Sequence, residues 1–349
     1  MRRLIAAALL VCLVAALAGC SLFSETYVSQ QPHHGNNGSN QSGQQIASSY
    51  PEILDALTTL VVQGETSGVI ILSDLSEQVG MSYMQAAVKN LQLQDPVAAY
   101  AVEDINYDMG TNAGRMAVAV KIDYSRSRAD ILSIKSVADM EEARQLVGQS
   151  LEQAVSSVTF CVDAFEQTDF TVLVQQYAQE NASMVMETPQ VMTAIYPRSG
   201  SNRLVELTFT YQTSQEELQK MQALVRPVFT AAELYVQGAS SSRMKFQRLH
   251  AFLMERSDYV FRNSTTPTYS LLEEGIGDSK AFACVYAAMC RQAGLECRVI
   301  QGVKDGKEWF WNRVVISNRV YYIDLIESEQ TGRLQFKTSS EMIGYSWNR

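Results

Sequence analysis

Residues 277–295, GDSKAFACVYAAMCRQAGL, decide the fold of the C-terminal part of the chain. They predict a helix that begins at Ser279, takes Asp278 or Ser279 as its N-cap, and ends at Gly294. Another helix is predicted ahead of it, over 245–259. Strands are predicted after it, over 297–302 and 320–324, with the aromatic run 309–311 between them.

The order and spacing of these segments, over 244–325, resemble the transglutaminase-like family, a papain-related group that uses a Cys-His-Asp triad. The resemblance implies an α+β domain in which helices pack on an antiparallel sheet. It also implies a cysteine nucleophile at the start of the second helix, where the helix dipole lowers the thiol pKa. An imidazole on a following strand pairs with the thiolate, and an aspartate on the next strand orients that imidazole.

Two of the three triad positions hold other residues in this chain. The nucleophile position falls on Ser279 and the histidine position on Trp309, whereas Asp324 has the expected type. A serine hydroxyl has too high a pKa for a helix dipole to ionise it, so it needs an adjacent base. Because tryptophan cannot accept a proton, we expect a degenerate, non-catalytic domain and assign no catalytic residue.

A shifted dyad of Cys284 and His250 is the alternative, and it would make the protein a peptidase, an amidase or an acyl-transfer enzyme. His250 is the only histidine besides the N-terminal pair His33-His34. Cys284 follows Ser279 by five residues, about 140° round the helix, and is expected to point away from the cleft. Packing roles are therefore expected for both residues, and hydrogen-bond contact between them in an open cleft would favour the enzyme.

The aromatic run of Trp309, Phe310 and Trp311 supplies the candidate binding residues. Side chains alternate between the two faces of a strand, so Trp309 is expected to point into the cleft. Trp311 is expected to point the same way or to pack beneath Trp309. An aromatic groove suits an extended peptide or a glycan, and the alternative is that these rings pack the sheet and plug an inactive cleft.

The N-terminus predicts a lipoprotein signal peptide over 1–19. Basic residues at positions 2 and 3 precede an apolar run over 4–18, which is shorter than the about 20 residues that span a bilayer. The small residues Leu17-Ala18-Gly19 stand before Cys20, which is expected to carry the lipid. The protein is therefore predicted to be anchored at the cell membrane on its extracytoplasmic face. Residues 20–49 are rich in Ser, Gln, Asn and Gly and predict a flexible linker.

The charge of the chain excludes some partners. The net charge of −9 becomes −11 without Arg2 and Arg3, because 26 basic residues then face 37 acidic ones. No basic stretch stands out, so nucleic acid is not an expected partner. No cluster of His and Cys has the spacing of metal ligands, and neither a metal nor another cofactor is expected. Cys12 would leave with the signal peptide and Cys20 would carry the lipid. The four remaining cysteines allow three pairings, but buried free thiols are preferred; they are Cys161, Cys284, Cys290 and Cys297.

The middle region, 50–240, predicts an α+β fold with helices over 51–62, 82–93 and 141–158. Two hairpins end in strands over 116–124 and 204–211, and a helical segment follows each, which suggests duplicated β-β-α units. Pro227 is expected to kink or split a helix over 214–236. Residues 238–242 predict a boundary, so the transglutaminase-like domain is placed at 241–349.

These features together predict a surface-anchored lipoprotein with an inactive transglutaminase-like domain. The domain would act as a peptide- or cell-wall-binding or scaffolding module. A third interpretation gives the function to residues 50–240 and leaves the C-terminal domain as a structural remnant.

Overall fold

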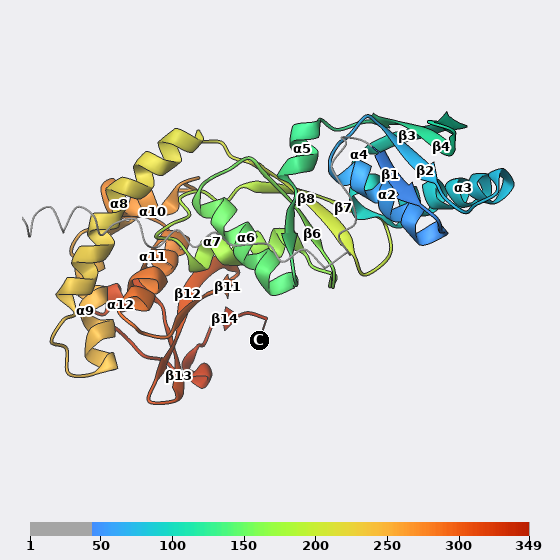
Figure 1. The fold of residues 1–349 in the computed structure, drawn as a ribbon. Helices are drawn as coiled ribbons and strands as arrows, with labels where there is room; N and C mark the ends of the chain where they lie inside the picture. Colours follow the sequence, from blue (N-terminus) through green and yellow to red (C-terminus); the bar gives the residue numbers. More distant parts are fainter. Residues whose placement is uncertain (1–43, 349) are drawn as a thin grey trace, which may run out of the picture. The chain divides into compact units, whose positions relative to one another are not determined.

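The computed structural model describes residues 44–348, and residues from Gly43 onward form one compact body. The predicted signal peptide, Cys20, His33, His34 and most of the predicted linker lie outside the described residues. The linker ends earlier than predicted, because residues 44–47 form a strand. No helix within 44–348 is long and apolar enough to cross a membrane. The predicted α+β class is confirmed, with three four-stranded sheets and helices between them (Figure 1).

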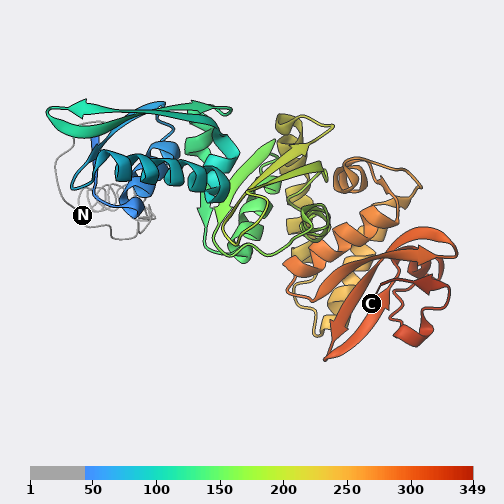
Figure 2. The same cartoon turned by 90° about the vertical axis from the view of Figure 1, so that its right-hand side faces the viewer.

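The first sheet contains a short initial strand, a second strand parallel to it, and a long antiparallel hairpin. The strands are β1 (Gln44–Ala47), β2 (Ser67–Leu72), β3 (Val102–Asn112) and β4 (Arg115–Tyr124), in the order β1-β2-β4-β3. The helices are α2 (Tyr50–Val62), α3 (Glu77–Gln94) and α4 (Pro96–Ala101). Figure 2 shows α2 and α3 on one face of this sheet. Buried side chains such as Leu57 and Val118 join these layers in one core.

The second sheet repeats this topology, with a parallel first pair and an antiparallel hairpin. Its strands are β5 (Lys135–Val137), β6 (Ser157–Val162), β7 (Gln190–Tyr196) and β8 (Arg203–Thr210), in the order β5-β6-β8-β7. Its helices are α6 (Met140–Glu152) and α7 (Phe170–Glu180), and α5 (Arg128–Ser133) precedes it. The region thus contains two units, but each is β-α-β-α-β-β and the hairpin closes it. The two predicted hairpins are present and a helix follows each of them, but the repeated unit is longer than the predicted β-β-α.

The third sheet is antiparallel and carries the C-terminal domain. Its strands are β11 (Cys297–Lys304), β12 (Lys307–Ile316), β13 (Arg319–Ile323) and β14 (Tyr345–Ser346), in the order β13-β12-β11-β14. The helix predicted from Ser279 is α11 (Ser279–Gln292), and α12 (Leu325–Gln330) follows β13. The remaining elements are α9 (Ser242–Met254), α10 (Pro267–Glu273) and a small pair of strands, β9 (Asp258–Tyr259) and β10 (Ile276–Gly277).

Helix α8 (Gln215–Tyr235) runs through Pro227 as a single helix, so of the predicted kink or split the split does not occur. Its buried residues, among them Val225 and Phe229, belong to the same core as α9 and α11. Ala182 and Met186 from the second unit also belong to this core. A hydrogen bond of 3.2 Å from the Arg291 guanidinium to the Asn181 side chain adds a polar contact. The second unit and the C-terminal domain are therefore packed on a shared hydrophobic core.

Candidate functional site

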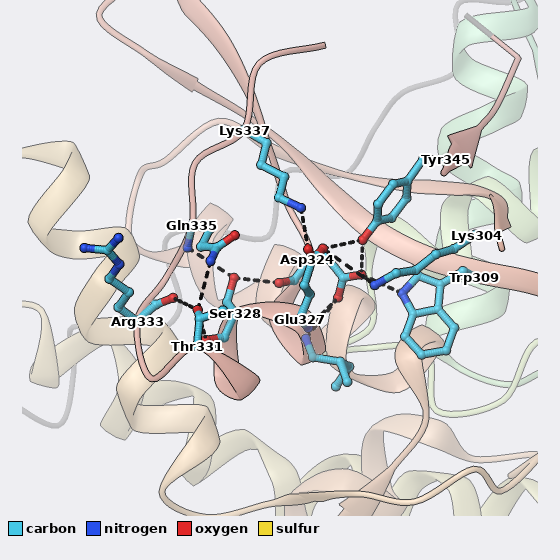
Figure 3. A network of polar contacts seen from close by, with 11 residues as sticks. Lys304, Trp309, Asp324, Glu327, Ser328, Thr331, Arg333, Gln335, Lys337 and Tyr345 are labelled. Atoms are coloured by element: carbon cyan, nitrogen blue, oxygen red, sulfur yellow. Dashed lines mark hydrogen bonds and ion pairs between the residues drawn. The ribbon is translucent and has the colours of Figure 1, made fainter. Parts of the chain in front are cut away.

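Asp324 lies at the end of β13, where its side chain caps helix α12. Its Oδ1 accepts hydrogen bonds from the backbone N–H groups of Ile326 and Glu327, at 3.0 and 3.1 Å. Its Oδ2 accepts from Lys304 Nζ at 2.7 Å, Trp309 Nε1 at 2.8 Å and Tyr345 Oη at 2.6 Å (Figure 3). The residue is only 3% exposed. Five donors thus satisfy a carboxylate that would otherwise be costly to bury.

Trp309, on β12, occupies the position that the resemblance gives to the catalytic histidine. Its indole N–H donates to Asp324, the interaction by which a triad aspartate holds its imidazole. The ring packs against Tyr259, with 5.7 Å between the ring centroids. Lys304 Nζ lies 5.2 Å from the Trp309 ring centroid, within the range of a cation–π contact. Because indole has a donor and no acceptor, Trp309 can donate to Asp324 but cannot act as a base.

Glu327 joins a second carboxylate to this network, beside Asp324 (Figure 3). It pairs with Lys337 and Lys304 and lies 2.6 Å from the Tyr345 hydroxyl, whose single proton it shares with Asp324. Burial raises the pKa of Glu327, but hydrogen bonds from Lys337 and Tyr345 outweigh it, so the pKa is lowered. Burial and the two carboxylates raise the pKa of the Tyr345 phenol. The network therefore holds two carboxylates, two ammonium groups and a neutral phenol.

Ser279 is the first residue of α11, and Asp278 is the N-cap, since Asp278 Oδ1 accepts from the Ala281 N–H at 2.9 Å. Ser279 Oγ accepts a hydrogen bond of 3.3 Å from the Phe310 N–H. Ser279 and Trp309 both line a cleft of about 900 Å³, whereas Asp324 is not part of its lining. The cleft is therefore lined by Ser279 and by the Trp309 indole, which is hydrogen-bonded to Asp324, and no histidine is among its lining residues.

The alternative dyad does not assemble in the residues that the structure describes. Cys284 lies in the core, 3% exposed, and burial raises its thiol pKa to about 12. His250 is 8% exposed, burial lowers its pKa, and its Nε2 has no partner within residues 44–348. No hydrogen bond joins the two side chains in that range. The four cysteines are free, and three of them are buried: Cys284, Cys290 and Cys297.

Trp311 does not reach the cleft, contrary to the sequence-based assignment of this residue to cleft binding. It is fully buried, and its ring lies 5.1 Å from that of Tyr345 and 5.4 Å from that of Trp347. Gly302 on β11 leaves room for it, because a Cβ there would lie 2.5 Å from the indole. The C-terminal strand thus covers this tryptophan. The alternation of side chains along β12 could not predict this, because Tyr345 and Trp347 lie more than thirty residues further along the chain.

Lys304 and Tyr345 are the site residues that the motif analysis missed. They lie on the adjacent strands β11 and β14, where they pair directly in register. Neither belongs to the triad pattern. The pairing of β11 with β12, and of β12 with β13, brings Lys304 to Asp324, and the pairing of β14 with β11 brings Tyr345 there. No cluster of three or more metal-ligating side chains occurs in residues 44–348.

The family model described as the transglutaminase-like superfamily matches residues 230–329. The chain therefore carries a transglutaminase-like domain, and the resemblance inferred from the motifs is confirmed. No protein with a curated function matches the chain.

Three solved structures show low similarity to this chain. A transglutaminase (TGase) is 11% identical, with a TM-score of 0.28, over 55% of this chain and 58% of that one. A proposed cysteine protease from Cytophaga hutchinsonii is 12% identical, with a TM-score of 0.27, over 45% and 70%. A proposed protease from Parabacteroides distasonis is 10% identical, with a TM-score of 0.25, over 63% and 35%. The chain thus spans less than two thirds of the first of these proteins.

The network around Glu327 predicts a pH-dependent contribution to stability. The folded-state pKa of Glu327 lies below the ordinary value of 4.5, so its ionised form stabilises the fold above that pH. This contribution is lost as the pH falls through the lowered pKa. Glu327→Gln is expected to lower the free energy of unfolding by about 1–3 kcal/mol at pH 7. The difference from wild type should shrink below pH 4.5 in urea unfolding followed by tryptophan fluorescence.

The exposed residue Glu329 provides the control variant, Glu329→Gln. An equal loss of unfolding free energy at pH 7 and pH 3 in Glu327→Gln, or the same pH profile in Glu329→Gln, would contradict this prediction.

Proposed function

We propose that the protein is an exported lipoprotein whose transglutaminase-like domain binds a peptide or cell-wall ligand without turning it over. One observation carries the proposal. Trp309 stands at the histidine position and donates its indole N–H to Asp324, so the domain keeps the architecture of the triad and lacks its base. A domain that retains the cleft but not the base is suited to a binding or scaffolding role.

The surroundings of Ser279 support the loss of catalysis. A serine nucleophile needs a base within hydrogen-bond reach, and the charged residues that line the cleft are Asp278, Lys280, Lys307 and Glu308. Asp278 is engaged in capping α11, and Glu308 accepts a hydrogen bond of 2.7 Å from Gln301. His250, the only histidine in the described part of the chain, is buried and does not line the cleft.

The location follows from the N-terminal sequence. The signal peptide places the mature chain outside the cytoplasm, and lipid on Cys20 attaches it to the membrane. The membrane is thus the first partner of the protein, reached through Cys20. The folded units would be presented at the cell surface, where peptide and cell-wall ligands are accessible.

The catalytic part of the proposal is tested with the mature protein made soluble by Cys20→Ser. Amine incorporation into a glutamine-containing protein, peptide hydrolysis and labelling of Ser279 by a fluorophosphonate are all expected to stay at the level of the Ser279→Ala variant. The double variant Ser279→Cys/Trp309→His is the positive control, since it restores a thiol and an imidazole. Its iodoacetamide reaction should be faster than that of Ser279→Cys alone. Activity in the otherwise unchanged protein that Ser279→Ala abolishes would overturn the proposal.

The anchoring part is tested by fractionation of cells that express the full chain. The wild type is expected in the membrane fraction, labelled by a fatty-acid probe. Cys20→Ala should lose the label and no longer be processed at the lipoprotein cleavage site. Cys12→Ala, within the signal peptide, is the matched control and should remain labelled. Equal labelling of the Cys20→Ala variant would show that the attachment lies elsewhere.

A further inference from the structure

We propose that the cleft takes a neutral oligosaccharide, held between an uncharged amide wall from the second unit and aromatic side chains of the transglutaminase-like domain. This inference rests on the proposed binding function and specifies its ligand. The two walls come from parts of the chain that share one core, and the second unit contributes one of them.

The first wall is formed by α7 and the start of β7. Thr171, Gln175 and Gln179 recur every four residues on α7, so they form one stripe along the helix. Thr188 and Gln190 continue it at the start of β7. Within the described residues, the side chains of Gln175 and Gln179 form no hydrogen bond with the protein. Each amide is therefore free to donate to one ligand hydroxyl and accept from a neighbouring one.

The second wall presents rings. Trp309 is half-buried in the cleft, Phe310 lies beside it, and Phe261 stands at the rim with 85% of its surface exposed. A sugar ring carries hydroxyls around its edge and C–H groups on its faces. Amides on one side and rings on the other match both of these surfaces.

The charges in the cleft indicate a neutral ligand. The wall from the second unit has none, although the whole chain carries a net charge of −9. The opposite wall has two acidic residues, Asp278 and Glu308, and two basic residues, Lys280 and Lys307. These charges balance, so the cleft has no excess charge to attract an ionic polymer.

An extended peptide suits the cleft less well. The edge strand β7 has a free edge that could pair with a peptide, but only Gln190 and Val191 of this strand line the cleft. Strand addition depends on main-chain hydrogen bonds over several residues. The volume of about 900 Å³ lies within the range of small-ligand sites, about 300–1,000 Å³, and suits a short oligosaccharide.

The test is a calorimetric titration of the mature protein, made soluble by Cys20→Ser, with the uncharged tetramer of β-1,4-linked N-acetylglucosamine. Saturable binding is expected. Gln175→Ala/Gln179→Ala should weaken it about tenfold and Phe261→Ala about fivefold, since each removes contacts worth about 1 kcal/mol or more. Gln176→Ala is the matched control, because Gln176 lies on α7 outside this cleft. It should bind like the unchanged protein.

The outcomes separate this inference from the proposed function. An absence of saturable binding by the tetramer, or binding that Gln175→Ala/Gln179→Ala leaves unchanged, overturns the oligosaccharide. If a blocked, uncharged hexapeptide binds in a Gln175-dependent way and the tetramer does not, the oligosaccharide is overturned and the binding function stands. Release of shorter oligomers from the tetramer, lost in the Ser279→Ala variant, overturns the non-catalytic proposal and leaves the ligand class supported.

Discussion

The buried carboxylate of Asp324 is the constraint on which the C-terminal domain depends. A charge taken out of water is stable only when it is paired and hydrogen-bonded. Here β11, β12 and β14 each supply one donor to Oδ2, and the first turn of α12 supplies two to Oδ1. Replacing the family's histidine by an apolar residue would remove one of these donors. Tryptophan supplies the N–H without an acceptor, so Trp309 satisfies Asp324 as a donor but cannot act as a base.

The motif order and the triad positions were predictable because they depend on local sequence. Ser279 begins α11 and Asp324 follows β13, as the spacing indicated. Tertiary contacts decided the rest. Tyr345 reaches Asp324 because the two-residue strand β14 pairs with β11, and a strand so short has no detectable period. The same holds for β1 and β5, of four and three residues, whose omission made the predicted repeat shorter than the observed one. Pro227 remained within α8 because packing of that helix on the core outweighs a local preference.

The shared core also links the duplicated region to the function of the site. Helix α7 belongs to the second unit, yet its polar stripe faces the cleft of the transglutaminase-like domain. The second unit and the transglutaminase-like domain are separate regions of the sequence, and neither one alone predicts a two-walled cleft. Their combination supports the proposed two-walled binding cleft, with the lipid on Cys20 proposed to hold the protein at the membrane.

The most direct test of this account is the state of the Trp309 indole N–H, observed by NMR of protein labelled with ¹⁵N at its three tryptophans. Trp309→Phe assigns the resonance. The account predicts an indole proton that exchanges slowly with solvent, shifted downfield by the carboxylate, and moved upfield by Asp324→Asn. An indole proton that exchanges like that of free tryptophan, with a resonance that Asp324→Asn leaves in place, would contradict the claim that Trp309 has replaced the histidine as the donor to Asp324.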